Sequence, residues 1–299
     1  MAAQTAGAEQ AAGVITVNPI TARFGEQRRV RVVEREIMVS GDARAFYAEL
    51  AVGVTMHNQA ASLRDCLASI SEQCDVPLPF TVLLLDDNST DAWQVELETL
   101  ATSVPVAVAQ VRCGSAARAR NCLLDVANGA FPVLRWVARL DADDRFASPD
   151  SLAAAVRLAL ASNARFVLGG NRLRRSGVLL GRTNPATPDL LNSSFVISRL
   201  AQMARGEPEA ELPSCNLLLA SGVPWRYPDQ TSAEDHWLVA ELLLRHPNLG
   251  RVLAEPFYAD YSLGGAVTSA NHRQARHLAA RQALWQTAQG WMGKERSSA

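Results

Sequence analysis

Two apolar runs that each end in aspartates decide the fold of this 299-residue chain: FTVLLLDDNSTD at residues 80–91 and VLRWVARLDADD at residues 133–144. Each run has the length and composition of a buried strand, and each stops where its carboxylates begin. Residues 51–56 and 104–111 form two further runs of the same kind. Four buried strands are therefore expected within the first half of the chain.

Apolar residues recur at helical spacing between these runs, in residues 60–71 and 116–127, and another helix is expected from residue 149. Asp91 is expected to cap the helix that follows it, and Asn128-Gly129 to end the next one. Strands that alternate with helices predict an α/β fold with a mostly parallel sheet and helices on both faces. Such sheets bind ligands outside the carboxyl ends of their strands, which is where both acidic clusters fall.

The regular region is flanked by appendages. The expected organisation is a disordered tail (1–13), a β extension (14–50), two halves of the main domain (51–170 and 171–265) and a C-terminal helix with a tail (266–299). The β extension, in which arginines alternate with valines, either packs on the main domain or forms an extra lobe for a partner. The C-terminal helix is expected to pack on the main domain or on a second subunit, as in a homodimer; binding to a membrane surface is the weaker alternative.

Charge and cysteine usage narrow the class of protein. The 29 basic residues against 30 acidic ones give no electrostatic reason to expect nucleic acid as a partner. No run approaches the roughly 18 apolar residues of an integral membrane segment, and no signal peptide is evident at the start. The five cysteines are odd in number and none forms a Cys-x-x-Cys pair, which favours reduced thiols and a cytoplasmic location.

The cluster Asp141-Ala142-Asp143-Asp144 has the chemistry of a cation site. Three carboxylates within four residues repel one another unless a positive charge lies among them. Mg²⁺ and Mn²⁺ prefer oxygen ligands and often take only one or two protein carboxylates, with water and phosphate completing the shell. The alternative is a solvated acidic turn before the next helix. Asp86-Asp87 also has two interpretations, a ligand-binding pair or a strand-to-helix turn.

Five motifs in order resemble glycosyltransferase family 2: Val54-Thr55-Met56-His57-Asn58, Leu85 to Asp91, Ala119-Arg120-Asn121, Leu140 to Asp144, and Glu234-Asp235. The resemblance spans residues 51–262. It implies a GT-A fold, a Rossmann-like α/β domain whose first half binds a nucleotide sugar and whose second half binds the acceptor and carries the catalytic base. His57 departs from the Tyr of many members, and the identity of the nucleobase is left open.

The resemblance also implies roles for individual residues. Donor binding falls to Thr55, Asn58, Asp87, Arg120, Asn121 and Asp141, the metal to Asp143 and Asp144, and general-base catalysis to Asp235. The implied reaction is an inverting transfer from a nucleoside-diphosphate sugar, with Mn²⁺ or Mg²⁺, to the hydroxyl of a small molecule, a glycan or a lipid-linked saccharide. The alternatives are a nucleotidyltransferase of similar architecture and a catalytically silent nucleotide-sugar-binding protein.

Residues around the expected base have two interpretations each. Trp225, Tyr227 and Trp237, with Glu234, form either an acceptor platform or ordinary packing, and Glu234 and Asp235 alone would suit the first turn of any helix. The basic run 172–175 with Arg182 either closes over the diphosphate or forms a solvated surface. His236 is expected to tune its neighbour Asp235.

Overall fold

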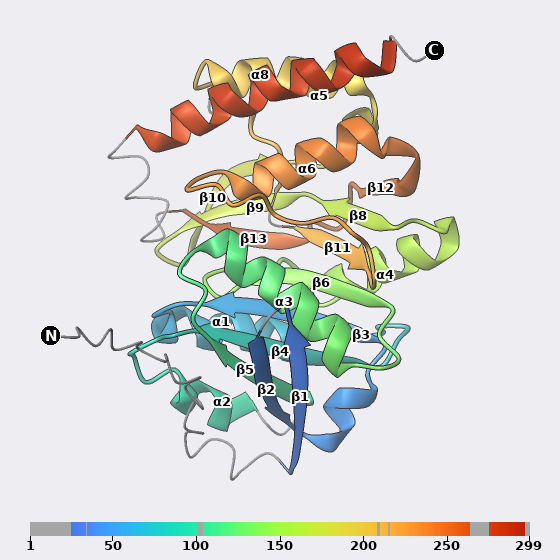
Figure 1. The fold of residues 1–299 in the computed structure, drawn as a ribbon. Coiled ribbons are helices and arrows are strands. Elements are labelled where there is room, and N and C mark those ends of the chain that lie inside the picture. Colours follow the sequence, from blue (N-terminus) through green and yellow to red (C-terminus); the bar gives the residue numbers. More distant parts are fainter. Residues whose placement is uncertain are drawn as a thin grey trace, which may run out of the picture.

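The computed structural model describes residues 25–33, 35–100, 104–207, 210–214, 216–263 and 275–296 (Figure 1). The expected tail (1–13), residues 14–24 of the β extension and residues 266–274 of the expected C-terminal segment lie outside the described residues.

Nine strands form the main sheet in the order β1-β2-β5-β4-β3-β6-β11-β8-β12. Their bounds are β1 Glu26–Val32, β2 Arg35–Gly41, β3 Leu50–Met56, β4 Phe80–Asp87, β5 Val106–Val111, β6 Trp136–Asp141, β8 Phe166–Gly169, β11 Leu217–Ala220 and β12 Gly250–Leu253. The four central strands β5, β4, β3 and β6 are mutually parallel. Strand β11 enters antiparallel between β6 and β8, and the β1–β2 hairpin extends the other edge antiparallel to β5.

The register brings the carboxyl ends of the central strands to one level. Thr55 of β3 lies opposite Leu85 of β4 on one side and opposite Asp141 of β6 on the other. Asp87, the last residue of β4, pairs with Val111 at the end of β5. The two acidic clusters therefore lie on one edge of the sheet, separated by β3.

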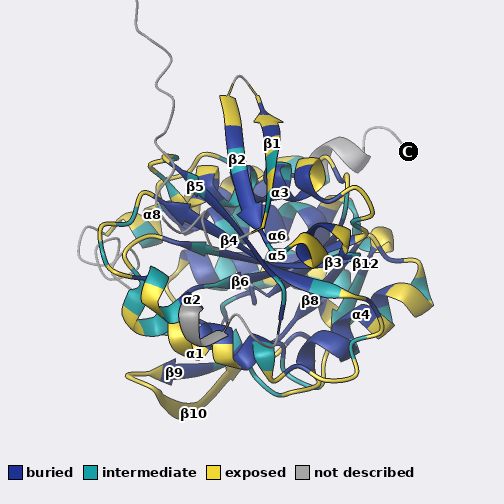
Figure 2. Cartoon of the chain, turned by 90° about the horizontal axis from the view of Figure 1, so that it is seen from below, coloured by how far each residue is buried: buried dark blue, intermediate teal, exposed yellow. Residues whose placement is uncertain are grey.

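Helices cover both faces of this sheet, as predicted. The α-helices of the described residues are α1 Ala60–Ser71, α2 Gln94–Leu100, α3 Ala116–Ala130, α4 Ser151–Ser162, α5 Ser193–Ala204, α6 Glu234–Arg245 and α8 Arg276–Arg296. Three short 3-10 helices in the same part of the chain are η2 Ala43–Tyr47, η3 Pro188–Leu191 and η5 Pro247–Leu249. In Figure 2, α3 and α6 lie on one side of the central strands while α1 and α4 lie on the other. The α/β class with an N-terminal strand extension and a C-terminal helix is confirmed.

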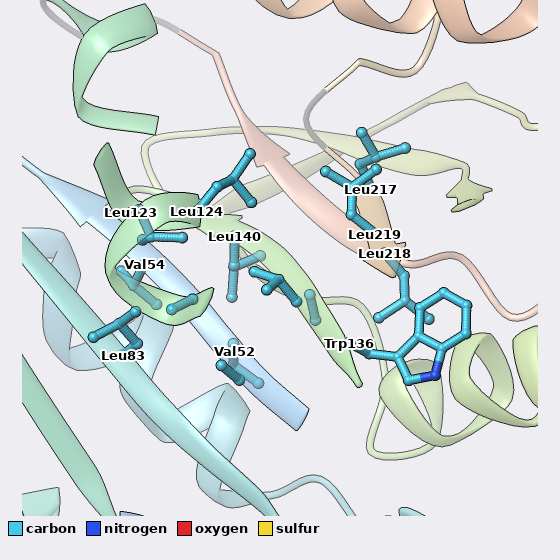
Figure 3. Packing of buried hydrophobic residues seen from close by; sticks show 14 of the residues in the cluster. Val52, Val54, Leu83, Leu123, Leu124, Trp136, Leu140, Leu217, Leu218 and Leu219 are labelled. Atoms are coloured by element: carbon cyan, nitrogen blue, oxygen red, sulfur yellow. The ribbon is translucent and has the colours of Figure 1, made fainter. Parts of the chain in front are cut away.

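Packing of α3 against the sheet fixes the position of the residues that follow the central strands. Leu123 of α3 lies against Gly53 of β3, on the face of the sheet that carries Leu83, and the side chains of Leu123 and Leu83 are fully buried (Figure 3). Burial of each such side chain contributes about 1.5–3 kcal/mol. Gly53 makes this approach possible, because a Cβ there would lie 2.5 Å from a methyl carbon of Leu123.

Two expected helix ends are wrong. Asp91 does not cap α2; its Oδ2 accepts a hydrogen bond from the backbone N–H of Ala60 and so caps α1, which lies beside it in space. Helix α3 runs through Asn128-Gly129 to Ala130, because the Asn128 side chain accepts bonds from Ser221 and Gly222 of the loop after β11. In both cases a tertiary contact takes the side chain that local sequence assigned to a cap.

A second sheet of four strands, which the sequence did not predict, has the order β10-β9-β13-β7. Its strands are β7 Arg145–Phe146, β9 Asn171–Arg175, β10 Val178–Asn184 and β13 Ala259–Ser262. Strand β7 directly follows the acidic cluster at the end of β6, so this sheet adjoins the candidate site. Helix α8 contacts α5 and α6. Among the described residues, no helix combines the length and apolar character that a bilayer crossing requires.

Candidate active site

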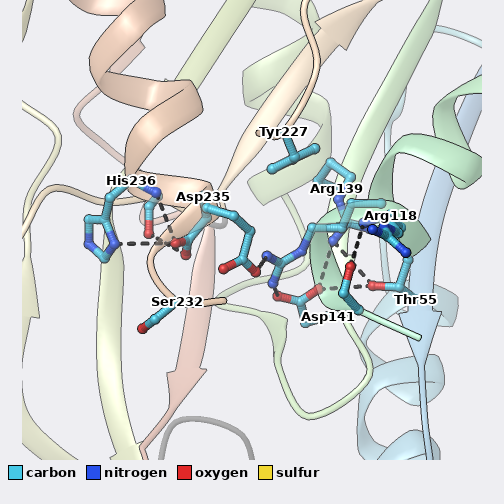
Figure 4. A network of polar contacts seen from close by, with 12 residues as sticks. Thr55, Arg118, Arg139, Asp141, Tyr227, Ser232, Asp235 and His236 are labelled. Atoms are coloured by element: carbon cyan, nitrogen blue, oxygen red, sulfur yellow. Dashed lines mark hydrogen bonds and ion pairs between the residues drawn. The ribbon is translucent and has the colours of Figure 1, made fainter. Parts of the chain in front are cut away.

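Asp141, the last residue of β6, lies at the centre of a buried polar network (Figure 4). Its Oδ1 accepts hydrogen bonds from Arg139 at 2.7 Å and from the Thr55 hydroxyl at 3.1 Å. Its Oδ2 accepts a bond from Arg120 of α3 at 2.8 Å. Burial alone would raise the pKa of Asp141, but the two arginines hold it below its usual range, so the carboxylate is ionised. Two predicted donor-binding residues, Thr55 and Arg120, are thus joined to a third.

Arg139 is a member of this network that the sequence analysis missed. It lies inside β6 and is only 1% exposed, and its guanidinium donates to the carbonyl oxygen of Gly53 at 2.9 Å as well as to Asp141. A charged side chain at such a place requires a partner, and residues two apart on a strand point to the same face. The two-residue spacing between Arg139 and Asp141 could have predicted that the two side chains pair, but the apolar neighbours of Arg139 made the segment read as an ordinary buried strand.

Arg120 links the central sheet to α6. One guanidinium nitrogen binds Asp141 and another binds Oε1 of Glu234, the first residue of α6. The Arg120 guanidinium also lies 5.6 Å from the ring centroid of Tyr227. A single cation therefore neutralises one carboxylate from the central sheet and one from the later segment, which brings Glu234 and its neighbour Asp235 to the strand ends.

Asp235 follows on α6 and is held by its own neighbours. Its Oδ2 accepts a bond from the Ser214 hydroxyl at 2.7 Å, and its Oδ1 accepts one from the backbone N–H of His236 at 2.8 Å. The His236 ring lies with Nδ1 at 3.2 Å from the same oxygen, in an ion-pair contact without hydrogen-bond alignment. Burial opposes ionisation, but His236 first, then Arg120 and Ser214, hold the pKa of Asp235 well below its usual range.

The same contact acts on His236 in the opposite direction. Burial would lower the pKa of this imidazole, but Asp235 and Glu234 raise it above its ordinary value of 6.5. His236 is 5% exposed, and its Nε2 has no hydrogen-bond partner among the described residues. The protonation state of His236 therefore sets how much negative charge Asp235 presents.

Asp143 and Asp144 differ in their surroundings. Asp144 is 1% exposed, and its Oδ1 accepts a bond from the backbone N–H of Ser262 in β13 at 2.7 Å. Asp143 is partly exposed, and no other described residue hydrogen-bonds to its carboxylate. Burial, followed by repulsion from Asp141, raises the pKa of Asp143 to about 6. Of the two predicted metal ligands, Asp143 is the one whose carboxylate remains available.

The strand end of β4 forms a separate group. The Asp87 carboxylate accepts bonds from the backbone N–H groups of Cys113 at 2.5 Å and Gly114 at 3.2 Å, in the loop between β5 and α3. His57 donates from Nδ1 to the Asp87 carbonyl oxygen at 2.7 Å, because a carbonyl can only accept. Asn58 accepts a bond from the backbone N–H of Thr90 at 2.7 Å. The predicted donor-binding residues Asp87 and Asn58 therefore fix loops around the strand ends, and no bond between described residues links them directly to Asp141.

Several predicted residues serve packing or loop attachment. Asn121 exchanges two hydrogen bonds with the backbone of Tyr227, at 2.7 and 2.8 Å, and so pins that loop to α3. Trp225 is 9% exposed and packs edge-on to Phe166, with ring centroids 5.8 Å apart. Trp237 packs edge-on against Trp291 of α8, at 6.4 Å.

These contacts favour the packing interpretation for the two tryptophans, and a role of Trp225 and Trp237 in acceptor binding stays a prediction. Tyr227 is 3% exposed and contributes its ring to Arg120, as described above. Trp225 and Tyr227 are therefore buried, whereas Trp237, on α6, is partly exposed.

The basic run after β8 lies on the second sheet. Arg172 pairs with Asp260 of β13 at 2.6 Å, and Arg174 donates to the carbonyl oxygen of Asp143 at 2.7 Å. Arg175 and Arg182 are exposed. The inner arginines thus position the acidic loop, and the outer two belong to the surface.

The donor set of the acidic loop fits a hard divalent cation. Its oxygens come from carboxylates, and no group of three preformed ligands occurs among the described residues. Mg²⁺ and Mn²⁺ are commonly held by one or two carboxylates, with phosphate oxygens and water as the other ligands. Asp143, with its open carboxylate and nearby Asp141, supplies that incomplete set.

Comparisons with known proteins agree with this geometry. The family model described as Glycosyl transferase family 2 matches residues 51–212. Residues 1–349 of S. aureus TarS in complex with UDP-GlcNAc are similar in structure, with 20% identity and a TM-score of 0.55, over 74% of this chain and 61% of that chain. The complex of the same TarS segment with UDP gives 19% identity and a TM-score of 0.53, over 78% of this chain and 65% of that chain.

The chain spans about three fifths of the TarS segment that it matches in the UDP-GlcNAc complex. At this level of identity the likeness shows a common fold. No curated protein is a significant match for the sequence.

Proposed function

Because the chain belongs to glycosyl transferase family 2, we propose that it transfers a sugar from a nucleoside-diphosphate donor to an acceptor hydroxyl. The observation that carries the proposal is the continuous run of contacts from Thr55 through Asp141 and Arg120 to Glu234. It joins the strand ends where such sheets bind ligands to the helix that carries Asp235. A site of this kind unites donor-binding groups with a carboxylate base.

The donor side of the proposal rests on the strand ends of β3, β4 and β6. A TarS structure of similar fold holds UDP-GlcNAc, which supports a nucleoside-diphosphate sugar as the class of donor. Arg120 and Arg139 hold Asp141 ionised, and Thr55 helps to fix its orientation, so that it would present oxygen acceptors of constant geometry for donor hydroxyls. The loop of Cys113 and Gly114, held by Asp87, would border the nucleotide.

A divalent cation bound at Asp143 would stabilise the negative charge that develops on the diphosphate as the glycosidic bond breaks. Asp144 would support the loop from behind through its bond to Ser262. Arg174 would do the same through the Asp143 carbonyl oxygen. The chain's own part is therefore to hold the Asp143 carboxylate free and directed by a fixed backbone.

Asp235 is proposed as the general base. Its Oδ2 accepts one bond from the Ser214 hydroxyl and its Oδ1 accepts one from the backbone N–H of His236, and lone pairs remain to take the proton of the acceptor hydroxyl. Asp235 is ionised at neutral pH, so it can accept the proton as the new bond forms. Single displacement with inversion follows if the acceptor approaches from the side of Asp235, opposite the leaving diphosphate.

The test compares Asp235→Asn with the unchanged protein. Loss of the base should lower transfer by about 10²–10⁴-fold, while donor binding, measured as thermal stabilisation by nucleotide sugars with Mn²⁺, stays within about twofold. Product analysis should find a nucleoside diphosphate. Release of pyrophosphate instead, or full transfer by the variant, contradicts the proposal.

A further inference from the structure

The β9–β10 hairpin exposes a row of apolar side chains. Val178, Leu179 and Leu180 of β10 are 65%, 42% and 38% exposed. Strand β10 is the edge of the second sheet, and Figure 2 shows it projecting from the body of the protein with its exposed surface outward. Three consecutive exposed aliphatic residues on an edge strand are unusual in a protein that meets only water.

The local sequence favours a hairpin at this place. Ser176 and Gly177 both have positive φ, 49° and 83°, which is the requirement of a two-residue turn between antiparallel strands. The pairing of β10 with β9 is then interrupted between Leu179 and Thr183, around Gly181 at φ 65°. This irregularity leaves the three apolar residues near the tip, while the inner strand β9 is packed against β13.

Every ionisable side chain of the segment 171–184 is an arginine. Arg172 and Arg174 point inward, to Asp260 and to the acidic loop. Arg175 and Arg182 flank the apolar row, are exposed, and form no ion pair with another described residue. The tip of the hairpin is therefore both apolar and positively charged.

We propose that the β9–β10 hairpin binds the surface of an anionic lipid bilayer. Aliphatic side chains gain from entering the boundary between headgroups and acyl chains, and arginines beside them meet the anionic headgroups. A second copy of the chain suits the surface less well. Pairing of two β10 edges would bring the arginines of both copies together, and the interruption at Gly181 breaks the row of backbone groups that such pairing uses.

The position of the hairpin gives this binding a consequence for the site. Arg174, which pairs with Leu179 near the turn of the hairpin, donates to the carbonyl oxygen of Asp143, and Ser262 of the adjoining strand β13 donates to Asp144. A bilayer at the hairpin tip therefore lies on the side of the molecule that carries the acidic loop. If the proposed transfer activity holds, the acceptor hydroxyl belongs to a lipid-anchored molecule; the binding itself does not depend on that activity.

The experiment measures sedimentation of the full chain with vesicles of phosphatidylglycerol and phosphatidylcholine, and with vesicles of phosphatidylcholine alone. Binding should require the anionic lipid and weaken as salt rises. The variant Val178→Ser/Leu179→Ser/Leu180→Ser should lower the partition coefficient by about tenfold or more. Arg175→Glu/Arg182→Glu should lower it by at least about fivefold for each arginine.

The β1–β2 hairpin offers a matched control, since Arg29 and Arg31 are exposed there and Val33 is 83% exposed. The variant Arg29→Glu/Arg31→Glu/Val33→Ser should bind as the unchanged protein does. A tryptophan probe at Leu179→Trp should be quenched by brominated lipid, and one at Val33→Trp should not. Thermal unfolding of each variant checks that it is folded.

Three outcomes overturn the proposal. In the first, the unchanged protein does not bind anionic vesicles. In the second, the hairpin variants bind as well as the unchanged protein. In the third, the control variant loses as much binding as the hairpin variants do. A protein that is dimeric in solution, ignores vesicles and becomes monomeric in the apolar hairpin variant assigns the surface to a second copy instead. Since none of these measurements uses sugar transfer, they are separate from the test of Asp235.

Discussion

The ends of β4 and β6 look alike in sequence and differ in structure. At the end of β4, Asp86 and Asp87 are satisfied by nearby groups: Asp86 by Ser89 and Gln110, and Asp87 by backbone N–H groups of the next loop. At the end of β6, Asp141 is held by arginines from two different elements, and Asp143 remains open. A position after a strand therefore does not decide the role of an aspartate. An aspartate whose carboxylate is fully hydrogen-bonded by the protein shapes a loop, whereas one whose carboxylate has no such partners is available to a ligand.

The largest expected effect tests whether the β6 end depends on its buried cation. Arg139→Met should lower the free energy of unfolding by about 3–5 kcal/mol, because it leaves the Asp141 carboxylate without one of its two buried partners. Urea unfolding measures the change. Arg118→Met, which removes an exposed arginine paired with Asp229, should leave stability unchanged. Similar losses in both variants would contradict the role assigned to Arg139.

The next effect tests the open carboxylate. Asp143→Asn should lower transfer by about 10²–10³-fold, since the loop would lose its charge toward a cation while its backbone contacts remain. Its thermal stability should be unchanged or slightly higher, because the repulsion between Asp143 and Asp141 is removed. Calorimetric titration with Mn²⁺ in the presence of a nucleoside diphosphate measures the binding. An Asp143→Asn protein that retains cation binding would shift the role to Asp144.

Asp87 should show the reverse pattern. Asp87→Ala removes the acceptor of two backbone N–H groups and should cost about 1–3 kcal/mol of stability. Transfer at saturating donor should fall much less than in Asp143→Asn, with the loss concentrated in donor affinity. Equal loss of the maximal rate in both variants would erase the distinction between the two strand ends.

The smallest effect concerns pH and the α6 side of the network. Below its raised pKa, which lies above 6.5, His236 is protonated and neutralises Asp235; above that pKa, Asp235 presents its full charge. The maximal rate should therefore rise with pH through this window by several-fold, on the order of three- to tenfold. In His236→Gln the rise should be absent. A variant that keeps the same pH profile removes His236 from control of the base.

The central sheet was predictable from sequence because its strands are uninterrupted apolar runs and its helices have apolar faces. Helix α1 begins and ends as expected, and the expected strands match β3, β4, β5 and β6 within a few residues. Strands β9, β10 and β13 were missed because arginines, polar residues and short length hide the alternation of a strand. These strands are stabilised by pairing with neighbouring strands and by ion pairs such as Arg172–Asp260, which no local sequence pattern reveals.

The candidate site was predictable in part. The family resemblance is confirmed, and the structure joins Thr55, Arg120 and Asp141 as neighbours, while their roles in donor binding remain predictions. Arg139 was hidden among apolar residues. The packing of Trp225 and Trp237 could not be predicted, because the exposure of an aromatic ring depends on which distant elements pack against it.

The shared guanidinium of Arg120 makes three positions interdependent. Replacing either Asp141 or Glu234 alone changes the charge that the other experiences, so the effects of the two substitutions will not add. Relatives that diverge at one of these positions should therefore carry a compensating change at another, and chains that keep Arg120 should keep both acids. Covariation among Arg120, Asp141 and Glu234 would be the evolutionary trace of one cation serving two segments that lie far apart in the sequence.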